Sequence, residues 1–191
     1  MMDDFINIDK TFEKIIRMDA RVTGREFDGC SFVHCDFSNT VFTECTFIDC
    51  TFTGCNLSMV KFPQTGLKTV TFKDCKLLGI PFDEADPFLF AIGAHDSTLD
   101  YSWFTGRKMP KTVFSSCSLK GVNFAGADVT GSDFSGCNLD GAVFDNTILK
   151  SADFSSAYNY KIDPQFNPME KAKFSQDGLP GLLEKYDIRI S

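Results

Sequence analysis

The chain has 191 residues, of which 43% are hydrophobic and 24% are charged, and its formal net charge is −7. This hydrophobic content excludes a disordered chain and suits one domain with a sizeable core. The acidic balance disfavours direct nucleic-acid binding, which depends on Lys and Arg neutralising phosphates.

The first ten residues, MMDDFINIDK, carry acidic side chains where a secretory signal needs basic ones, and no apolar run approaches the length of a membrane span. We therefore expect a cytoplasmic protein with no membrane partner. In that compartment the eight cysteines are expected to be reduced thiols.

Residues 1–21 are predicted to form an N-terminal cap on the core. The apolar residues of this segment are spaced three and four apart, which favours a short amphipathic helix. They are Phe5, Ile8, Phe12, Ile15 and Ile16.

Residues 22–82 contain a repeat with a period of five, which fits neither a helix nor a strand. The central apolar residue of each unit is called a centre below. The centres of this first register are Val22, Phe27, Phe32, Phe37, Phe42, Phe47, Phe52, Leu57, Phe62, Leu67, Phe72, Leu77 and Phe82.

Residues 83–88 form a junction, because seven residues instead of five separate Phe82 from the next centre, Leu89. One interpretation is a two-residue bulge at a corner. The alternative is a projecting loop of about twelve residues that ends near Leu99, and loops of this kind often bind partners. In that case Phe88 and Phe90 are candidates for a partner contact.

Residues 89–157 contain the second register, displaced by two residues from the first. Only Ala94 is a small centre in this register. Its centres are Leu89, Ala94, Leu99, Phe104, Met109, Phe114, Leu119, Phe124, Val129, Phe134, Leu139, Phe144, Leu149 and Phe154.

The position two before each centre, called the small-residue slot below, holds all eight cysteines and mostly small or β-branched residues elsewhere. Arg25 and Arg107 are exceptions. We interpret the slot as an inward position beside a bulky centre in a densely packed interior. Glycine is frequent two residues after the centre, where it indicates a turn with positive φ.

Units such as CDFSN, CTFID, CNLSM, ADFSS and ADVTG resemble the pentapeptide-repeat family, whose unit is a small residue, a polar residue, Leu or Phe, and two polar residues. The resemblance covers residues 22–157. It implies an all-β fold, a right-handed quadrilateral β-helix with four units per coil, in which residues 20 apart stack on one another.

Residues 158–191 are predicted to form a C-terminal cap. Asn167 and Pro168 look like an N-cap followed by Pro at the first helical position. A further short helix is expected from Pro180, followed by a strand in which Ile188 and Ile190 alternate.

This ending is similar to the helix and tail through which family members of the Qnr, MfpA and McbG groups dimerise. The resemblance implies a homodimer, and the alternative is a simple lid on the last coil. The candidate dimerisation residues are Leu182, Leu183, Tyr186 and Ile188.

No group of residues in the sequence has the pattern of a catalytic or metal site. His34 and His95 fall in outward positions. Cys35, Cys55 and Cys75 are expected to stack, but they lack His partners and room for tetrahedral zinc, and parallel Cβ vectors do not suit a disulfide. We predict that the protein is not an enzyme and uses no cofactor or metal.

The outward charge is unevenly distributed along the repeat. Residues 121–149 contain Asp128, Asp133, Asp140 and Asp145 and no Lys or Arg, which approaches the charge density of duplex DNA. The alternative is an ordinary solvated surface with ladders of opposite charge, such as Asp100, Lys120 and Asp140.

Two functions remain open from the sequence. The first is a Qnr-like DNA mimic that binds a type II topoisomerase, DNA gyrase or topoisomerase IV, and modulates the action of a quinolone or toxin. The four aspartates would make that contact, with Phe88 and Phe90 as a second candidate surface. The second is a general scaffold with an unknown protein partner, since a fold alone does not decide function.

Overall fold

A turn after every centre bends the chain into square coils. The residue two after the centre has positive φ, as at Gly29 (φ 61°) and His34 (φ 52°). Four units complete one coil, because Ile6 pairs with Glu26 and Thr11 with Ser31, each 20 residues on. The predicted fold class, an all-β right-handed quadrilateral β-helix, is confirmed.

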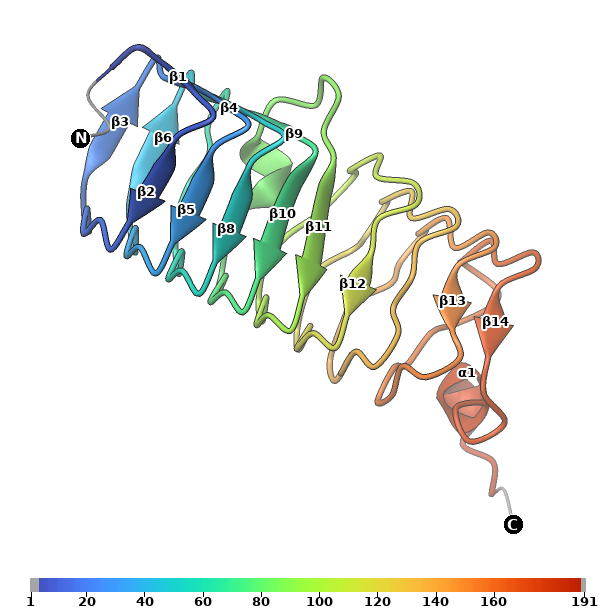
Figure 1. Ribbon diagram of the computed structural model, residues 1–191. Coiled ribbons are helices and arrows are strands. Elements are labelled where there is room, and N and C mark those ends of the chain that lie inside the picture. The colour runs from blue at the N-terminus through green and yellow to red at the C-terminus, as the bar shows by residue number, and fades with distance from the viewer. Residues whose placement is uncertain (1–3, 190–191) are drawn as a thin grey trace.

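The computed structural model describes residues 4–189 as a parallel β-solenoid of about eight turns followed by a short helix (Figure 1). Its elements are β1 (Ile6–Ile8), β2 (Thr11–Glu13), β3 (Arg21–Thr23), β4 (Glu26–Asp28), β5 (Ser31–Val33), β6 (Val41–Thr43), β7 (Thr46–Ile48), β8 (Thr51–Thr53), β9 (Gly66–Lys68), β10 (Val70–Lys73), η1 (Phe82–Glu84), β11 (Ile92–His95), β12 (Phe114–Ser115), β13 (Asp153–Phe154), β14 (Lys173–Phe174), α1 (Pro180–Leu183) and η2 (Glu184–Tyr186).

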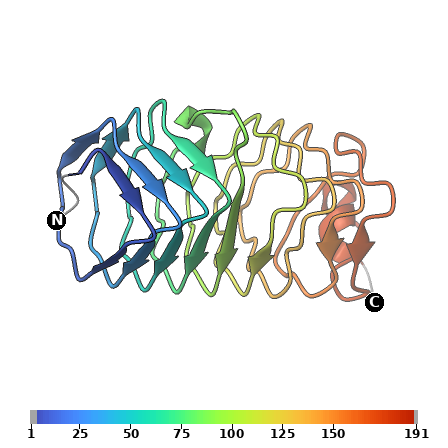
Figure 2. The ribbon, with the colours of Figure 1, turned by 45° about the horizontal axis from the view of Figure 1, so that its top comes forward.

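The solenoid has four sides, numbered here in chain order, and the coils stack along its length (Figure 2). Side 1 contains the sheet β1-β4-β7-β9, and side 2 contains the sheet β2-β5-β8-β10-β11-β12 and the pair β13-β14. Side 3 is held by single bridges that start at Ile16 and Asp36. Side 4 contains β3 and β6 and continues through bridges such as that between Pro81 and Trp103.

The core is a set of phenylalanine stacks that run along the axis. Rings 20 residues apart are nearly parallel, as in Phe32 and Phe52, whose centroids lie 4.4 Å apart at 9°. Rings on neighbouring sides meet edge to face, as Phe42 and Phe47 do at 5.4 Å and 83°. Each such pair adds about 1 kcal/mol beyond the area that it buries, which explains the preference for Phe.

The small-residue slot does more than leave room for the centres. The Thr65 hydroxyl donates to the Phe42 carbonyl at 2.8 Å and accepts the Cys45 N–H at 3.2 Å. The Cys50 thiol donates to the Phe27 carbonyl at 3.3 Å in the equivalent way. The slot therefore favours small side chains that can hydrogen-bond backbone groups at the corners, where packing alone does not explain Cys, Ser and Thr.

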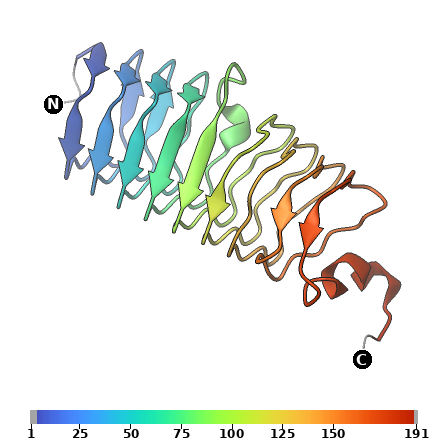
Figure 3. The same cartoon turned by 45° about the vertical axis from the view of Figure 1, so that its right-hand side comes forward.

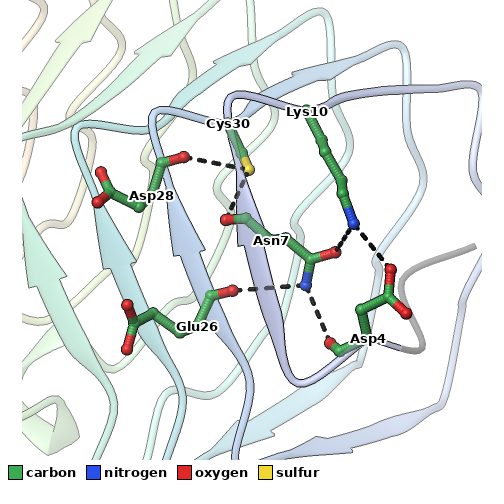
Figure 4. Close-up of polar contacts among 6 residues, drawn as sticks. All are labelled: Asp4, Asn7, Lys10, Glu26, Asp28 and Cys30. Atoms are coloured by element: carbon green, nitrogen blue, oxygen red, sulfur yellow. Dashed lines mark hydrogen bonds and ion pairs between the residues drawn. The ribbon is translucent and has the colours of Figure 1, made fainter.

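The predicted N-terminal helix is wrong, because β1, β2 and β3 already form a solenoid coil. The centres of this coil include Asn7 and Arg17, so the five-residue period is hidden by polar residues. Figure 4 shows how Asn7 closes the end of the core: its amide donates to the Asp4 carbonyl at 3.0 Å and accepts from the Lys10 ammonium at 3.1 Å. Lys10 also pairs with the Asp4 carboxylate at 2.7 Å.

The C-terminal end also departs from prediction. No helix begins at Asn167, which instead occupies a small-residue slot and binds the Thr147 N–H at 2.9 Å. The repeat continues to β14, so the solenoid extends beyond residue 157. The helix predicted from Pro180 is confirmed as α1, while Ile188 is in no strand and Ile190 lies outside the described residues.

Candidate functional site

The most irregular feature of the solenoid surface is the junction between the two registers. Lys76 still pairs one coil on, but with Thr98, so the offset has grown from 20 to 22 residues. The N–H of Asp86 still binds the Thr65 carbonyl, and strand pairing resumes at β11. The junction is therefore a two-residue bulge on side 1, and the twelve-residue projecting loop is wrong.

Phe90 and Leu89 exchange the roles expected from the sequence. Phe90 is buried and meets the Phe82 ring edge to face at 6.4 Å, so it belongs to the core and is not available for a partner. Leu89, which the five-residue period makes a centre, is 64% exposed and has φ 56°. The bulge moves the inward position by one residue.

Arg107 fastens the bulge from inside. It is buried in a small-residue slot, where its Nε donates to the Phe82 carbonyl at 2.9 Å and its Nη2 to the Ala85 carbonyl. Its guanidinium also lies 4.8 Å from the centroid of the Phe90 ring. Burial lowers the pKa of Arg107, an effect opposed by the nearby charges of Asp83 and Asp86.

Phe88 and Leu89 form an exposed apolar pair at the tip of the bulge, called the Phe88–Leu89 knob below, and each is 64% exposed. The Asp86 carboxylate accepts the Phe88 N–H at 2.9 Å, and the Lys68 ammonium lies 5.3 Å from the centroid of the Phe88 ring. These contacts hold the knob in one conformation. The bulge is the loop that rises between β10 and β11 in Figure 1.

A shallow groove lies beside the bulge, on the corner between sides 4 and 1. Three of its lining residues are acidic, so a basic group of a partner would be favoured there. The groove is lined by Glu44, Gln64, Glu84, Ala85, Asp86 and Pro87.

The four aspartates predicted to make one acidic contact lie on four different sides. Asp128 bridges Lys108 on side 1, and Asp133 bridges Val113 on side 2. Asp140 follows Asn138 on side 3, and Asp145 follows Val143 on side 4; both neighbours are bridge residues. The aspartates therefore form a collar around the rod, and no single side carries more than one of them.

Neighbouring groups temper the charge of this collar. Asp128 accepts hydrogen bonds from the N–H and the hydroxyl of Thr130, at 3.0 and 2.6 Å. One coil earlier, Lys108 lies directly beside Asp128 on side 1. On side 3, Lys120 lies 20 residues before Asp140, and its N–H donates to Asp100 at 2.9 Å.

The C-terminal tail packs on the last coil (Figure 3). The Ile162 N–H donates to the Gly181 carbonyl at 3.0 Å, and Lys185 pairs with Asp163 at 2.6 Å. Of the predicted dimerisation residues, Leu182 and Leu183 are half-buried, whereas Tyr186 and Ile188 are more than half exposed.

Among residues 4–189 no group of three or more His, Cys, Asp and Glu side chains is arranged to hold a metal ion. His95 shares a hydrogen bond of 2.7 Å with the Ser115 hydroxyl, without an acidic partner. All eight cysteines are buried and unpaired. No helix in the described part of the chain is long and apolar enough to cross a membrane.

Comparisons with known proteins agree with this geometry. Residues 25–87 match the model of a pentapeptide repeat region, and residues 114–157 match that of pentapeptide repeats in nine copies. No curated protein matches the chain.

Two solved structures illustrate the likeness of fold. A trypsin-treated variant of QnrB1, a plasmid-mediated fluoroquinolone resistance protein, is 19% identical with a TM-score of 0.60, covering 93% of this chain and 99% of its own. HetL, involved in heterocyst differentiation regulation in the cyanobacterium Nostoc sp. strain PCC 7120, is 17% identical with a TM-score of 0.59, covering 90% and 88%. Because the two structures differ in function, their likeness shows the fold alone.

Proposed function

Because the chain belongs to the pentapeptide-repeat proteins, we propose that it is a non-enzymatic rod that binds another protein through the Phe88–Leu89 knob. One observation carries this proposal: two adjacent large apolar side chains, each 64% exposed, stand on the bulge where the repeat register changes. Exposed apolar anchors beside charged groups are typical of the centres of protein interfaces.

The knob is also rigid, which favours binding. The buried Arg107 fixes the bulge from below, and Asp86 fixes the Phe88 N–H from the side. A surface that is already ordered loses little conformational entropy when a partner covers it. The neighbouring groove, with Glu44 and Glu84, favours a partner whose apolar pocket is flanked by basic residues.

Site-specific photo-crosslinking in the native cells tests this function. A benzoylphenylalanine at position 88 is expected to give one discrete protein adduct that disappears with Leu89→Asp. The matched control places the same group at Tyr158, which is 50% exposed on side 3. The same adducts from both positions would reject the knob as the contact.

A second candidate function is binding to a type II topoisomerase as a DNA mimic. The observation that favours it is the collar of aspartates, since duplex DNA presents negative charge all around its axis. A partner on one side would meet one of the four carboxylates, so this function requires an enzyme that grips the rod from several sides. A tail-to-tail homodimer through Tyr186 and Ile188 would double the number of collars.

A gyrase supercoiling assay with and without a fluoroquinolone tests this second function. The expected result is inhibition or protection that weakens when Asp128, Asp133, Asp140 and Asp145 are all changed to Asn. No effect of the unmodified protein on supercoiling or on drug action would exclude it. We also propose a cytoplasmic location, which suits eight unpaired cysteines.

A further inference from the structure

The first coil presents an open β edge. In the second coil the Glu26 N–H donates to the Phe5 carbonyl, and the Asp28 carbonyl accepts the Asp9 N–H. The equivalent groups of the first coil, in Ile6 and Ile8, have no preceding coil among residues 4–189 and point out of the end. The same holds for the other three sides, so a square of unpaired strand edges faces outward beside the N-terminus (Figure 3).

The outward residues of this edge are apolar where the next coil is polar. On side 1, Ile6 and Ile8 are each 59% exposed, and on side 3 Ile16 and Met18 are 73% and 51% exposed. The residues that follow them 20 positions on are Glu26, Asp28, Asp36 and Ser38. Only the edge coil therefore carries apolar pairs on these two opposite sides, which indicates that the edge itself is covered by a partner.

The interior of the edge is closed, so the partner does not extend the core. Asn7 fills the position of a centre and is fully buried, and Lys10 fills a small-residue slot while paired with Asp4. A partner that continued the phenylalanine stacks would leave these polar groups buried against apolar rings, which is costly. The contact is expected at the rim, between backbone edges and outward side chains.

We propose that a second copy of this chain covers the edge, head to head, about a two-fold axis that passes through Asn7 on side 1. Two antiparallel edges related by this axis pair residues whose numbers sum to 14, or to 34 after one coil of 20. Ile6 then faces Ile8 of the second copy, and Ile16 faces Met18. These are the residues whose backbone groups point outward, so the register also satisfies the strand hydrogen bonds.

Charge selects this axis over the alternatives. Glu13 on side 2 faces Arg21 of the second copy on side 4, and Thr11 faces Thr23, so both sides are complementary. A two-fold through β2 would instead set Glu13 against Thr11 and leave Arg21 against Thr23. Opposite charges in directly facing strand positions stabilise an antiparallel pair, and a symmetric contact repeats each pair twice.

Sedimentation equilibrium of the full chain tests the proposal, which is independent of the Phe88–Leu89 knob. Each protein also carries Tyr186→Lys, so that a tail-to-tail contact does not contribute. The parent is expected to be a dimer, and Glu13→Arg and Arg21→Glu are each expected to weaken it at least tenfold. The combined swap restores the opposite charges and is expected to restore the dimer. Glu44→Arg is the matched control, an equal charge change on an outward position away from the edge.

Circular dichroism confirms that each variant is folded before its mass is measured. A monomeric parent would overturn the proposal. So would a Glu13→Arg protein that dimerises like the control, or a combined swap that stays dissociated. An additional Ile16→Lys substitution is expected to abolish the dimer in every background, because it places a charge against Met18 of the second copy.

Discussion

Replacing Gly121 with Ala is expected to destabilise the solenoid more than the same change at Gly106. Both glycines are at turn positions with nearly equal positive φ, +62° and +66°. Alanine in this left-handed region costs about 1 kcal/mol at either site. The difference between the sites comes from the coil before, because Tyr101 lies over Gly121 and no atom lies within 4 Å of a Cβ at Gly106.

The extra cost at Gly121 follows from the distances. An added Cβ would lie 2.7 Å from Cδ1 and 2.9 Å from Cε1 of the Tyr101 ring, closer than van der Waals contact allows. Tyr101 is 67% exposed, so its ring can swing outward but loses its packing on the corner. We expect this displacement to add about 1–2 kcal/mol, giving about 2–3 kcal/mol for Gly121→Ala in all.

Urea unfolding followed by circular dichroism measures these free energies. A double-mutant cycle gives the sharper test, since Tyr101→Ala removes the ring and is expected to reduce the cost of Gly121→Ala to that of Gly106→Ala. Equal destabilisation by the two glycine substitutions, or no coupling between Tyr101 and Gly121, would refute the steric argument.

Three further substitutions or measurements test the interior and the charges. Arg107→Met removes both hydrogen bonds to the bulge carbonyls and is expected to cost about 3 kcal/mol in urea unfolding, and it should raise the proteolytic cleavage rate at the knob. Hydrogen bonds from Lys173 and Ser155 lower the pKa of Asp153 to about 2, so its contribution to stability, present above the ordinary Asp pKa, is lost as the pH falls toward 2, and Asp153→Asn should flatten that part of the stability profile. Burial raises the pKa of Cys50 to about 12, so labelling of this thiol at pH 8 should occur only at the rate of unfolding; fast labelling of the folded protein would contradict the packing described.

Most of the core could be predicted from the period of five, because nearly every centre from Phe27 to Phe154 is buried. The N-terminal coil escaped that reasoning because Asn7 and Arg17 occupy centres, leaving apolar residues whose spacing imitates a helix. At the bulge, Leu89 and Phe90 are both apolar, so the pattern cannot choose between them. The choice depends on the edge contact of Phe90 with Phe82 and on the buried Arg107, which are three-dimensional facts.

The scattering of the four aspartates, by contrast, was available from the sequence. Residues share a side only when their numbers differ by 20, and Asp128, Asp133, Asp140 and Asp145 differ by no multiple of 20. A window of 29 consecutive residues measures charge along the chain but mixes the four sides. Charge in a solenoid has to be counted by side before a patch is inferred from it.

The same rule predicts which substitutions weaken binding at the knob. A partner seated on side 1 meets residues stacked at intervals of 20, so Lys68, beside the Phe88 ring, and Ile48, paired with Lys68, belong to the same contact as the knob. Lys73 is only five residues from Lys68 but lies on side 2. We therefore expect Lys68→Glu and Ile48→Asp to reduce crosslinking from position 88, while Lys73→Glu leaves it unchanged. Equal loss from Lys68→Glu and Lys73→Glu would mean that the partner responds to net charge and not to one side of the rod.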